Sequence, residues 1–308
     1  MRGAAVTGWG AALPETVVTN ADLEARLDTT DEWIVERTGI RERRVGGTTS
    51  SLATEAAAQA LDRAALRPSD IDLLLLATTT PDQAVPATSP EVAHRLGLTC
   101  GAMDLNAACS GFVYALVAAA GMVGLGVDRV LVIGAETLSR IVDQDDRTTA
   151  VIFADAAGAV VLEAVPGETK LLGYDLGADG SLRSLLYCDH GGFIVMEGQE
   201  LFRRAVRATV ESARAALERA KVTAEEITLF VPHQANLRII DAAGQRLGLP
   251  RERTALVLDR TGNTSAASVP VALADAVDDG RLSPGDLVLL SGFGAGMTWA
   301  SAVLRWGR

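Results

Sequence analysis

Cys109 has the residue type and the surroundings that acyl transfer requires of a nucleophile. It lies among small residues, 107–111, and an apolar stretch with helical character follows it directly. The unpaired N–H groups and the dipole of a helix start favour an anion and lower the pKa of a thiol. Although a cysteine before an Ala-rich helix is often inert core, this position predicts a reactive thiolate that accepts an acyl group.

His233 and Asn263 are the two other chemical candidates. His233 follows the apolar run 229–231, and Asn263 precedes another apolar helical segment. Alone, each also fits a structural role, as a hydrogen-bonded histidine or a helix N-cap. Together they offer two neutral donors, which suit the enolate oxygen formed when a β-keto or malonyl thioester loses carbon dioxide. A cysteine protease, in which Asn orients His, uses the same three residue types.

An internal duplication places Cys109 and Asn263 at equivalent helix starts of two similar halves, apart from a three-residue gap, and places His233 after a strand. Three pairs of segments repeat in the same order, at offsets of 156, 151 and 158 residues: 64–76 and 220–231, 94–98 and 245–249, 128–134 and 286–292. Each copy combines buried strands with a helix that ends at a glycine C-cap. The sequence predicts an α/β protein with mixed, mostly parallel sheets, divided into halves 1–166 and 167–308 that pack as one rigid body. Such a fold could bring all three candidates to one pocket, and the duplication argues against the protease.

The glycine-rich segment 292–296 resembles a dinucleotide-binding loop, but the residues after it do not fit one. Residues 298–304 have strand character and no helix signature, so a Rossmann site is not indicated. The glycines instead predict a close approach of the backbone to a ligand.

Composition excludes several classes of protein. A net charge of −11 argues against nonspecific nucleic-acid binding. Three cysteines at no metal-ligand spacing indicate neither a disulfide framework nor a metal site. No apolar run approaches the ~20 residues of a membrane span, and no secretory signal is visible, so we expect a cytoplasmic protein without a membrane. The segment 201–210 carries three arginines and no acid, which fits either a solvated helix face or a docking face for an acidic partner.

With these motifs assembled, the chain resembles the thiolase superfamily and, most closely, the β-ketoacyl-acyl-carrier-protein synthase III family. The resemblance extends over essentially the whole chain and is most specific in a few short stretches: 30–34, 37–40, 108–111, 233–236 and 262–267. The stretches together are far more specific than any one of them.

The resemblance implies a duplicated five-layer αβαβα sandwich that works as a homodimer and holds no permanent cofactor. It implies decarboxylative Claisen condensation of an acyl-CoA starter with malonyl-acyl-carrier protein, which initiates fatty-acid or polyketide-like chains. Cys109 would carry the acyl group, while His233 and Asn263 would stabilise the enolate. The backbone N–H groups of Cys109 and Ala295 would form the oxyanion hole.

The resemblance also assigns binding residues. Trp33 and Arg147 would sandwich the adenine of CoA, and the remaining CoA positions are Thr29, Arg37 and Asn236. The acyl pocket would be lined by four residues: Val85, Phe202, Phe293 and Met297. Arg203 and Arg238 match the family's cationic residues that dock the acidic carrier protein.

Some features depart from the family pattern and leave other functions open. The segment 181–196 is roughly ten residues shorter than in familiar members, and Val85 replaces a Phe that some members extend into the partner subunit's pocket, so we expect a more open acyl pocket. A related acyltransferase or starter-unit enzyme of secondary metabolism would also use Cys109 and His233. A non-catalytic partner subunit predicts a lost nucleophile, which this chain retains. A reversible thiolase would need a second cysteine, and 292–297 has none.

Overall fold

The computed structural model describes residues 2–307, and its strands form two main sheets. The first sheet has the order β1-β7-β6-β4-β5. Its strands are β1 (Arg2–Ala12), β4 (Leu73–Ala77), β5 (Gly101–Leu105), β6 (Arg129–Thr137) and β7 (Asp155–Pro166). The second sheet has the order β11-β12-β13-β8. Its strands are β8 (Leu171–Ala178), β11 (Leu229–Pro232), β12 (Leu287–Gly294) and β13 (Thr298–Arg305).

Two small antiparallel pairs complete the strands. They are β2 (Val17–Thr19) with β3 (Glu42–Arg44), and β9 (Leu186–Cys188) with β10 (Ile194–Met196). The β9–β10 hairpin makes up most of the segment 181–196.

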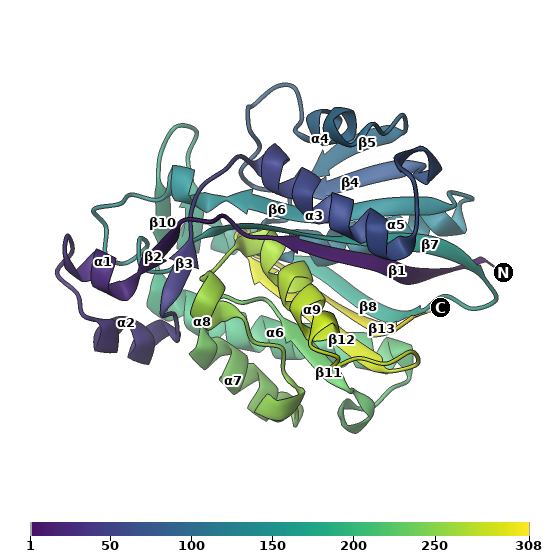
Figure 1. Ribbon diagram of the computed structural model, residues 1–308. Helices are drawn as coiled ribbons and strands as arrows, with labels where there is room; N and C mark the ends of the chain where they lie inside the picture. Colours follow the sequence, from purple (N-terminus) through teal and green to yellow (C-terminus); the bar gives the residue numbers. More distant parts are fainter. Residues whose placement is uncertain (1, 308) are drawn as a thin grey trace.

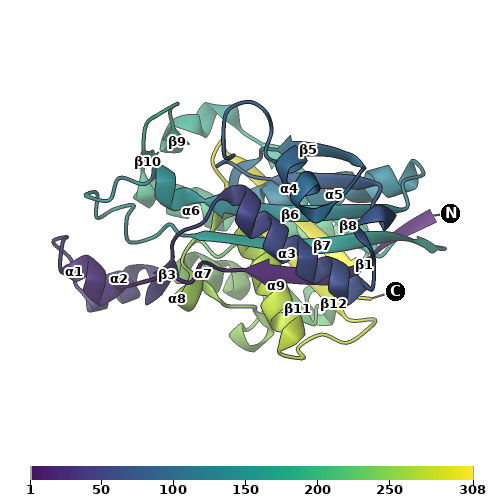
Figure 2. The same cartoon turned by 45° about the horizontal axis from the view of Figure 1, so that its top comes forward.

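Helices cover both sheets and fill the space between them, as Figures 1 and 2 show. The outer face of the first sheet carries α3 (Thr49–Ala64) and α4 (Ser89–Leu96), and the outer face of the second carries α6 (Gly198–Ala220) and α7 (Leu237–Leu247). Between the sheets lie α5 (Gly111–Gly124) and α9 (Ser268–Asp278). The short helices are α1 (Asn20–Glu24), α2 (Asp31–Thr38) and α8 (Leu258–Thr261). These are the five layers that the resemblance implies.

The composition of each helix explains its layer. The middle helix α5 carries no charged residue and buries Phe112 and Leu116, as expected of a helix covered on both sides. The outer helix α6 is amphipathic, with Val206, Val210 and Ala213 buried against the second sheet and its arginines on the solvent side.

The predicted repeat appears in the backbone. The paired segments form β4 and β11, and then β6 and β12. Gly97 ends α4 and Gly248 ends α7, with φ angles of 72° and 73°. Glycine adopts this left-handed conformation without the steric cost that a Cβ imposes, which confirms both predicted C-caps.

The prediction of mostly parallel sheets is wrong, although the sheets are mixed as expected. Parallel pairs join β4 to β5, β4 to β6 and β11 to β12. The pairs β1–β7, β6–β7, β12–β13 and β13–β8 are antiparallel. The reason is that β7 and β13 each return beside the preceding strand without a crossover helix.

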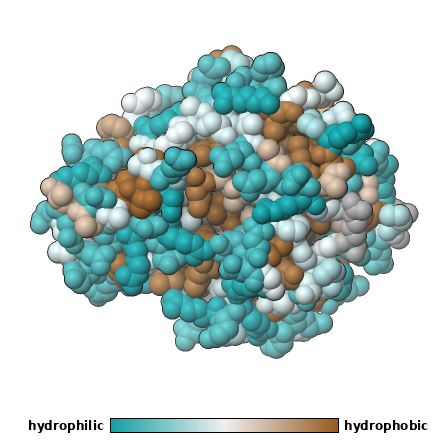
Figure 3. Space-filling view, viewed as in Figure 1, coloured by the Kyte–Doolittle hydropathy of each residue, from teal (hydrophilic) through white to brown (hydrophobic). Residues whose placement is uncertain are grey.

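The face shown in Figure 3 is mainly hydrophilic, with its apolar residues in separate groups. Within residues 2–307, no helix is both long and apolar enough to cross a bilayer. The cytoplasmic location stays a prediction.

Candidate active site

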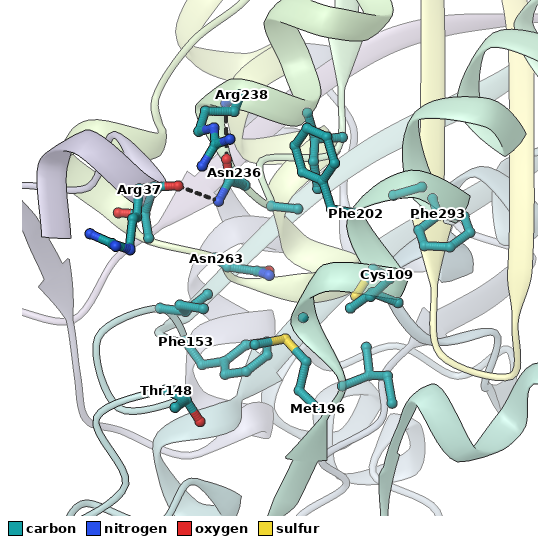
Figure 4. Close-up of a pocket in the computed structure, with 18 of the residues that line it drawn as sticks. Arg37, Cys109, Thr148, Phe153, Met196, Phe202, Asn236, Arg238, Asn263 and Phe293 are labelled. Carbon is teal, nitrogen blue, oxygen red and sulfur yellow. Dashed lines mark hydrogen bonds between the residues drawn. The ribbon is translucent and has the colours of Figure 1, made fainter. Parts of the chain in front are cut away.

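One cavity of about 680 Å³ brings Cys109, His233 and Asn263 together. Cys109 comes from the turn before α5, His233 from the end of β11, and Asn263 from the loop between α8 and α9. In Figure 4, Cys109 and Asn263 face the same space, with Phe293 on one side and Met196 on the other. The duplicated fold therefore collects side chains that are up to 154 positions apart in the sequence (263 − 109).

Cys109 lies in the 3₁₀ turn Ala108–Ser110, which leads directly into α5. The thiol is buried, and this burial raises its pKa to about 12, while a hydrogen bond with the Ser265 side chain acts in the opposite direction. The expectation of a lowered thiol pKa is therefore wrong, because desolvation outweighs the favourable helix start. Near neutral pH the thiol is protonated and must lose its proton as it attacks.

Glycines at the end of β12 let that strand approach the nucleophile. A Cβ on Gly294 would lie 2.5 Å from the backbone nitrogen of Cys109, and one on Gly292 would lie 2.8 Å from the Cα of Ser110. Real Cβ atoms do not come so close, so side chains at these positions would displace the turn. The structure thus shows a close approach of β12 to the Cys109 turn, and the approach to a ligand stays a prediction.

His233 is held from behind by Ser268. The ring Nδ1 lies 2.6 Å from Ser268 Oγ, and the backbone N–H of Gln234 donates to the same oxygen over 3.3 Å. Because Ser268 Oγ already accepts a hydrogen bond from Gln234, we assign the Ser268 hydroxyl as the donor to His233 Nδ1. Nδ1 is then unprotonated, and Nε2 carries the ring proton and can donate. Burial lowers the pKa of His233 to about 3, so the imidazole is neutral at pH 7.

Asn263 is oriented by its own loop. Its Oδ1 accepts the Ser265 backbone N–H over 2.9 Å, so Nδ2 is the atom that remains for a ligand. Its backbone is bound on both sides, by Ile152 O and by the N–H of Ala154, each at 2.9 Å. Asn263 does not orient His233, whose Nδ1 contact is with Ser268. This geometry differs from the cysteine-protease arrangement, in which Asn holds His.

The repeat explains why Asn263 and Cys109 are close to equivalent. In the first half, Asn106 Oδ1 accepts the Ala108 N–H over 3.1 Å, just as Asn263 accepts from Ser265. Ala108 and Ser265 share the same unusual φ of 47°. The offset of 157 residues makes Asn106 the counterpart of Asn263, so Cys109 corresponds to Ala266 (109 + 157 = 266). The two halves thus contain equivalent turns, and each turn supplies its functional side chain from a different position: Cys109 in the first half and Asn263 in the second.

The aromatic ring predicted to bind adenine is flanked by two arginines. Trp33 and Arg37, both on α2, line the mouth of the cavity. The guanidinium carbon of Arg37 lies 4.5 Å from the Trp33 ring centre, and that of Arg147 lies 5.2 Å away. Arg147 also donates to Asp28 O over 2.6 Å. A purine between Trp33 and Arg147 needs more space than 5.2 Å, so stacking would require Arg147 to swing out.

Asn236 joins the two sides of the cavity mouth. Its Nδ2 donates to Arg37 O over 2.8 Å, and its Oδ1 caps α7 by accepting the Arg238 N–H over 2.9 Å (Figure 4). Thr29 and Arg147 are not among the residues that line the cavity, and within residues 2–307 the buried Thr29 Oγ1 has no hydrogen-bond partner. The CoA roles of all five residues stay predictions.

The four predicted acyl-pocket residues occupy different places. Phe202 and Phe293 line the cavity, whereas Met297 is buried behind Phe293 in the same apolar cluster. Val85 is 84% exposed and does not line it. The sequence analysis missed several apolar lining residues: Ile152, Phe153, Leu186 and Met196. Ile152 and Phe153 lie in the irregular segment before β7, and Leu186 and Met196 lie on strands of only three residues, so no periodic pattern could have identified them.

The arginines of segment 201–210 form ion pairs with acidic residues that lie just outside that segment. The pairs run along α6: Arg204 with Glu200 at 2.8 Å and Arg207 with Glu211 at 2.8 Å. Arg203, which lines the cavity mouth, is 71% exposed and lies 3.8 Å from Glu200. Such exposed pairs contribute little to stability, so these side chains can exchange partners readily.

Comparisons with known proteins agree on one family. The family model for 3-oxoacyl-(acyl-carrier-protein) synthase III matches residues 103–180, and the model for its C-terminal part matches 217–306. The β-ketoacyl-(acyl-carrier-protein) synthase III of Erythrobacter litoralis is 50% identical over 98% of this chain and 99% of its own length.

Solved structures agree with this result. The 3-oxoacyl-(acyl-carrier-protein) synthase III of Aquifex aeolicus is 46% identical, covers 99% of this chain and 100% of its own, and has a TM-score of 0.97. A priming β-ketosynthase of the R1128 polyketide pathway is 37% identical over 99% of this chain and 96% of its own, with a TM-score of 0.94. The chain therefore belongs to the β-ketoacyl-(acyl-carrier-protein) synthase III family, whose members are acyl-transferring condensing enzymes.

Proposed function

We propose that this enzyme condenses an acyl-CoA starter with malonyl-acyl-carrier protein through an acyl-Cys109 intermediate. The observation that carries the proposal is the cavity in which a nucleophile and two neutral donors face one another. The family membership supports the same chemistry.

Acylation begins at the Cys109 sulfur. The sulfur attacks the thioester carbon of acyl-CoA, the carbon–sulfur bond to CoA breaks, and the thiol proton ends on the departing CoA. The Cys109 N–H, kept accessible by Gly294, would stabilise the tetrahedral oxyanion. The second predicted donor, the Ala295 N–H, lies on the adjoining residue, although Gly294 rather than Ala295 lines the cavity.

Condensation then needs a stabilised enolate. When the malonyl thioester loses carbon dioxide, the electron pair of the broken bond becomes an enolate. Its oxygen accepts from His233 Nε2 and Asn263 Nδ2. The pKa of His233, lowered to about 3, keeps the imidazole from protonating the carbanion. The carbanion attacks the acyl-Cys109 carbonyl carbon, and the cysteine sulfur leaves and is reprotonated.

The lining of the acyl pocket bears on the starter group and on the pathway. The likeness to a polyketide priming ketosynthase favours a second candidate, a starter-unit enzyme of secondary metabolism. Leu186 and Met196, opposite each other in the β9–β10 hairpin, line the cavity and belong to the shortened segment. Self-acylation with a panel of acyl-CoAs, read by intact mass, distinguishes a short-chain starter from longer or branched ones.

We also propose that the enzyme is a homodimer. Strand β5 lies at an edge of the first sheet, and Met103 on it is 44% exposed. An open edge strand with apolar residues favours pairing with a second copy. Val85 is also exposed in the single chain, which fits the predicted contact with the partner subunit. A monomer mass by light scattering at micromolar concentration would contradict this.

Docking of the acidic carrier protein is proposed on the outer side of the cavity mouth. Arg203 and Arg238 both line the mouth, from α6 and α7. Arg238 on α7 lies over the Phe202 ring on α6 at 5.5 Å, so the two helices are in contact at this point. Their positive charge would attract the acidic partner despite the net charge of −11.

The decisive experiment separates acylation from decarboxylation. Cys109→Ala should abolish the acyl-enzyme mass shift with acyl-CoA. His233→Ala and Asn263→Ala should retain that shift and lose malonyl decarboxylation by ~10²–10³-fold, the usual effect of removing one oxyanion donor. Retained carbon dioxide release in both variants would refute the role of the enolate donors.

A further inference from the structure

Glu136 is a buried carboxylate that the proposed reaction does not use. It lies near the end of β6, and its side chain is completely buried. A carboxylate in such a place requires compensation, because desolvation raises its pKa and disfavours its charge. Its hydrogen bonds therefore show what it holds in place.

One set of donors comes from residues 78–80, directly after β4. The Thr79 N–H donates to both carboxylate oxygens over 3.1 Å, and the Thr80 N–H donates to Oε2 over 3.1 Å. The hydroxyls of Thr78, Thr79 and Thr80 donate to Oε2 over 3.3, 3.0 and 2.5 Å. This loop follows β4 as His233 follows β11 in the other half. Five donor groups of this loop thus hold the Glu136 carboxylate.

The remaining donor connects Glu136 to the active site. The Ser265 hydroxyl donates to Glu136 Oε1 over 3.0 Å. The backbone N–H of the same serine holds Asn263 Oδ1 over 2.9 Å, and the serine side chain also lowers the pKa of the Cys109 thiol. Ser265 has a φ of 47°, in the left-handed region that is costly for a residue with a side chain. A conformation of that kind persists only when its surroundings fix it.

The repeat shows how the same space is used differently in the two halves. The offset of 158 between β6 and β12 pairs Glu136 with Gly294 (136 + 158 = 294). Where Gly294 leaves the Cys109 turn open to a ligand, Glu136 fills the equivalent place beside the Ser265 turn with its own carboxylate. One turn is free to react, and the other is fixed.

We propose that Glu136 is a positioning residue for decarboxylation: its carboxylate fixes Ser265, and Ser265 in turn holds the Asn263 amide and lies beside the Cys109 thiol. The proposal rests on the proposed condensation. It predicts that weakening the Glu136–Ser265 contact impairs the enolate donor far more than it impairs acyl transfer to Cys109.

Glu136→Gln tests this positioning role. The substitution keeps the shape of the side chain almost unchanged but places an amide NH₂, which is itself a donor, among groups that donate. We expect acylation by acyl-CoA near the wild-type rate and a loss of malonyl decarboxylation of ~10²-fold, as for a group displaced by about 1 Å. Ser265→Ala removes the same contact from the other side and should give the same split. It also serves as the test if Glu136→Gln does not fold.

The pH dependence of Cys109 alkylation by iodoacetamide gives a readout that a purely structural role would not move. The charge of Glu136 raises the thiol pKa, whereas the Ser265 side chain lowers it. Glu136→Gln should therefore shift the profile to lower pH, and Ser265→Ala should shift it to higher pH. Shifts in the same direction, or no shift, would overturn the proposal.

Asp155→Asn is the matched control. Asp155 is also fully buried, on β7, and accepts from Gly46 N and from Ser139 N and Oγ rather than from Ser265. The substitution should lower the melting temperature without changing the ratio of decarboxylation to acylation. An equal change of that ratio in Asp155→Asn and Glu136→Gln would refute positioning. If wild-type enzyme releases no carbon dioxide, the proposed function fails, while the alkylation profiles still decide whether Glu136 and Ser265 act on Cys109.

Discussion

Gly294→Ala should inactivate the nucleophile through a single methyl group. The added Cβ would lie 2.5 Å from Cys109 N, 3.0 Å from Ala108 Cβ and 3.1 Å from Cys109 Cβ. An ordinary contact needs roughly 3.5 Å or more between such atoms, so the turn must retreat by about 1 Å. A displacement of that size at a reacting group costs ~10²-fold in rate. The same overpacking should lower the free energy of unfolding by about 1–3 kcal/mol.

Gly173→Ala is the matched control for this prediction. Its Cβ would lie 2.4 Å from Ala220 N and 2.5 Å from Ala216 O, an equally severe clash between β8 and α6. Neither group lines the cavity. The assay is the rate of acyl-enzyme formation, read by intact mass, beside urea unfolding of both variants. Equal acylation rates in Gly294→Ala and Gly173→Ala, at a similar loss of stability, would refute a displacement of the Cys109 turn.

Three further predictions concern charge and binding. Because the pKa of His233 is about 3 in the folded protein and 6.5 is the ordinary value, the unfolded chain binds a proton that the folded protein does not, so stability falls as pH decreases from 6.5 towards 3. By pH 5 wild type should lose about 2 kcal/mol more than His233→Gln in urea unfolding, and equal losses would contradict this. Trp33→Ala should raise the KM for acyl-CoA and leave decarboxylation of malonyl-carrier protein unchanged; an unchanged KM would exclude stacking on this ring. Arg203→Glu with Arg238→Glu should raise the KM for the carrier substrate while self-acylation by acyl-CoA stays constant, and equal effects on both would argue against a docking face.

The sequence predicted the elements that depend on local pattern. Continuous apolar runs identified β4 and β11, and glycines identified the ends of α4 and α7. The repeat then placed Cys109 and Asn263 at related turns, which the shared φ of 47° at Ala108 and Ser265 confirms. These features could be predicted because they depend on the periodicity of nearby residues and on backbone conformations that few residue types adopt.

What the sequence could not predict depends on packing between distant segments. The raised pKa of Cys109 comes from burial, and β12 reaches that turn from the other half of the chain. Glu136 and Ser265 are 129 positions apart, and nothing in either segment indicates their contact. The prediction of mostly parallel sheets was wrong for a related reason. A run of apolar residues does not reveal the direction of the neighbouring strand.

Discharge of the acyl-enzyme shows whether acyl transfer and decarboxylation belong to one reaction. Wild-type enzyme incubated with acyl-CoA is freed of excess substrate, and malonyl-carrier protein is then added while the intact mass and released carbon dioxide are followed together. We expect a mass increase of one acyl group on Cys109, which disappears as one carbon dioxide and one β-ketoacyl product form for each acyl group lost. Loss of the acyl group without carbon dioxide, or no acyl-enzyme at all, would contradict the proposed condensation.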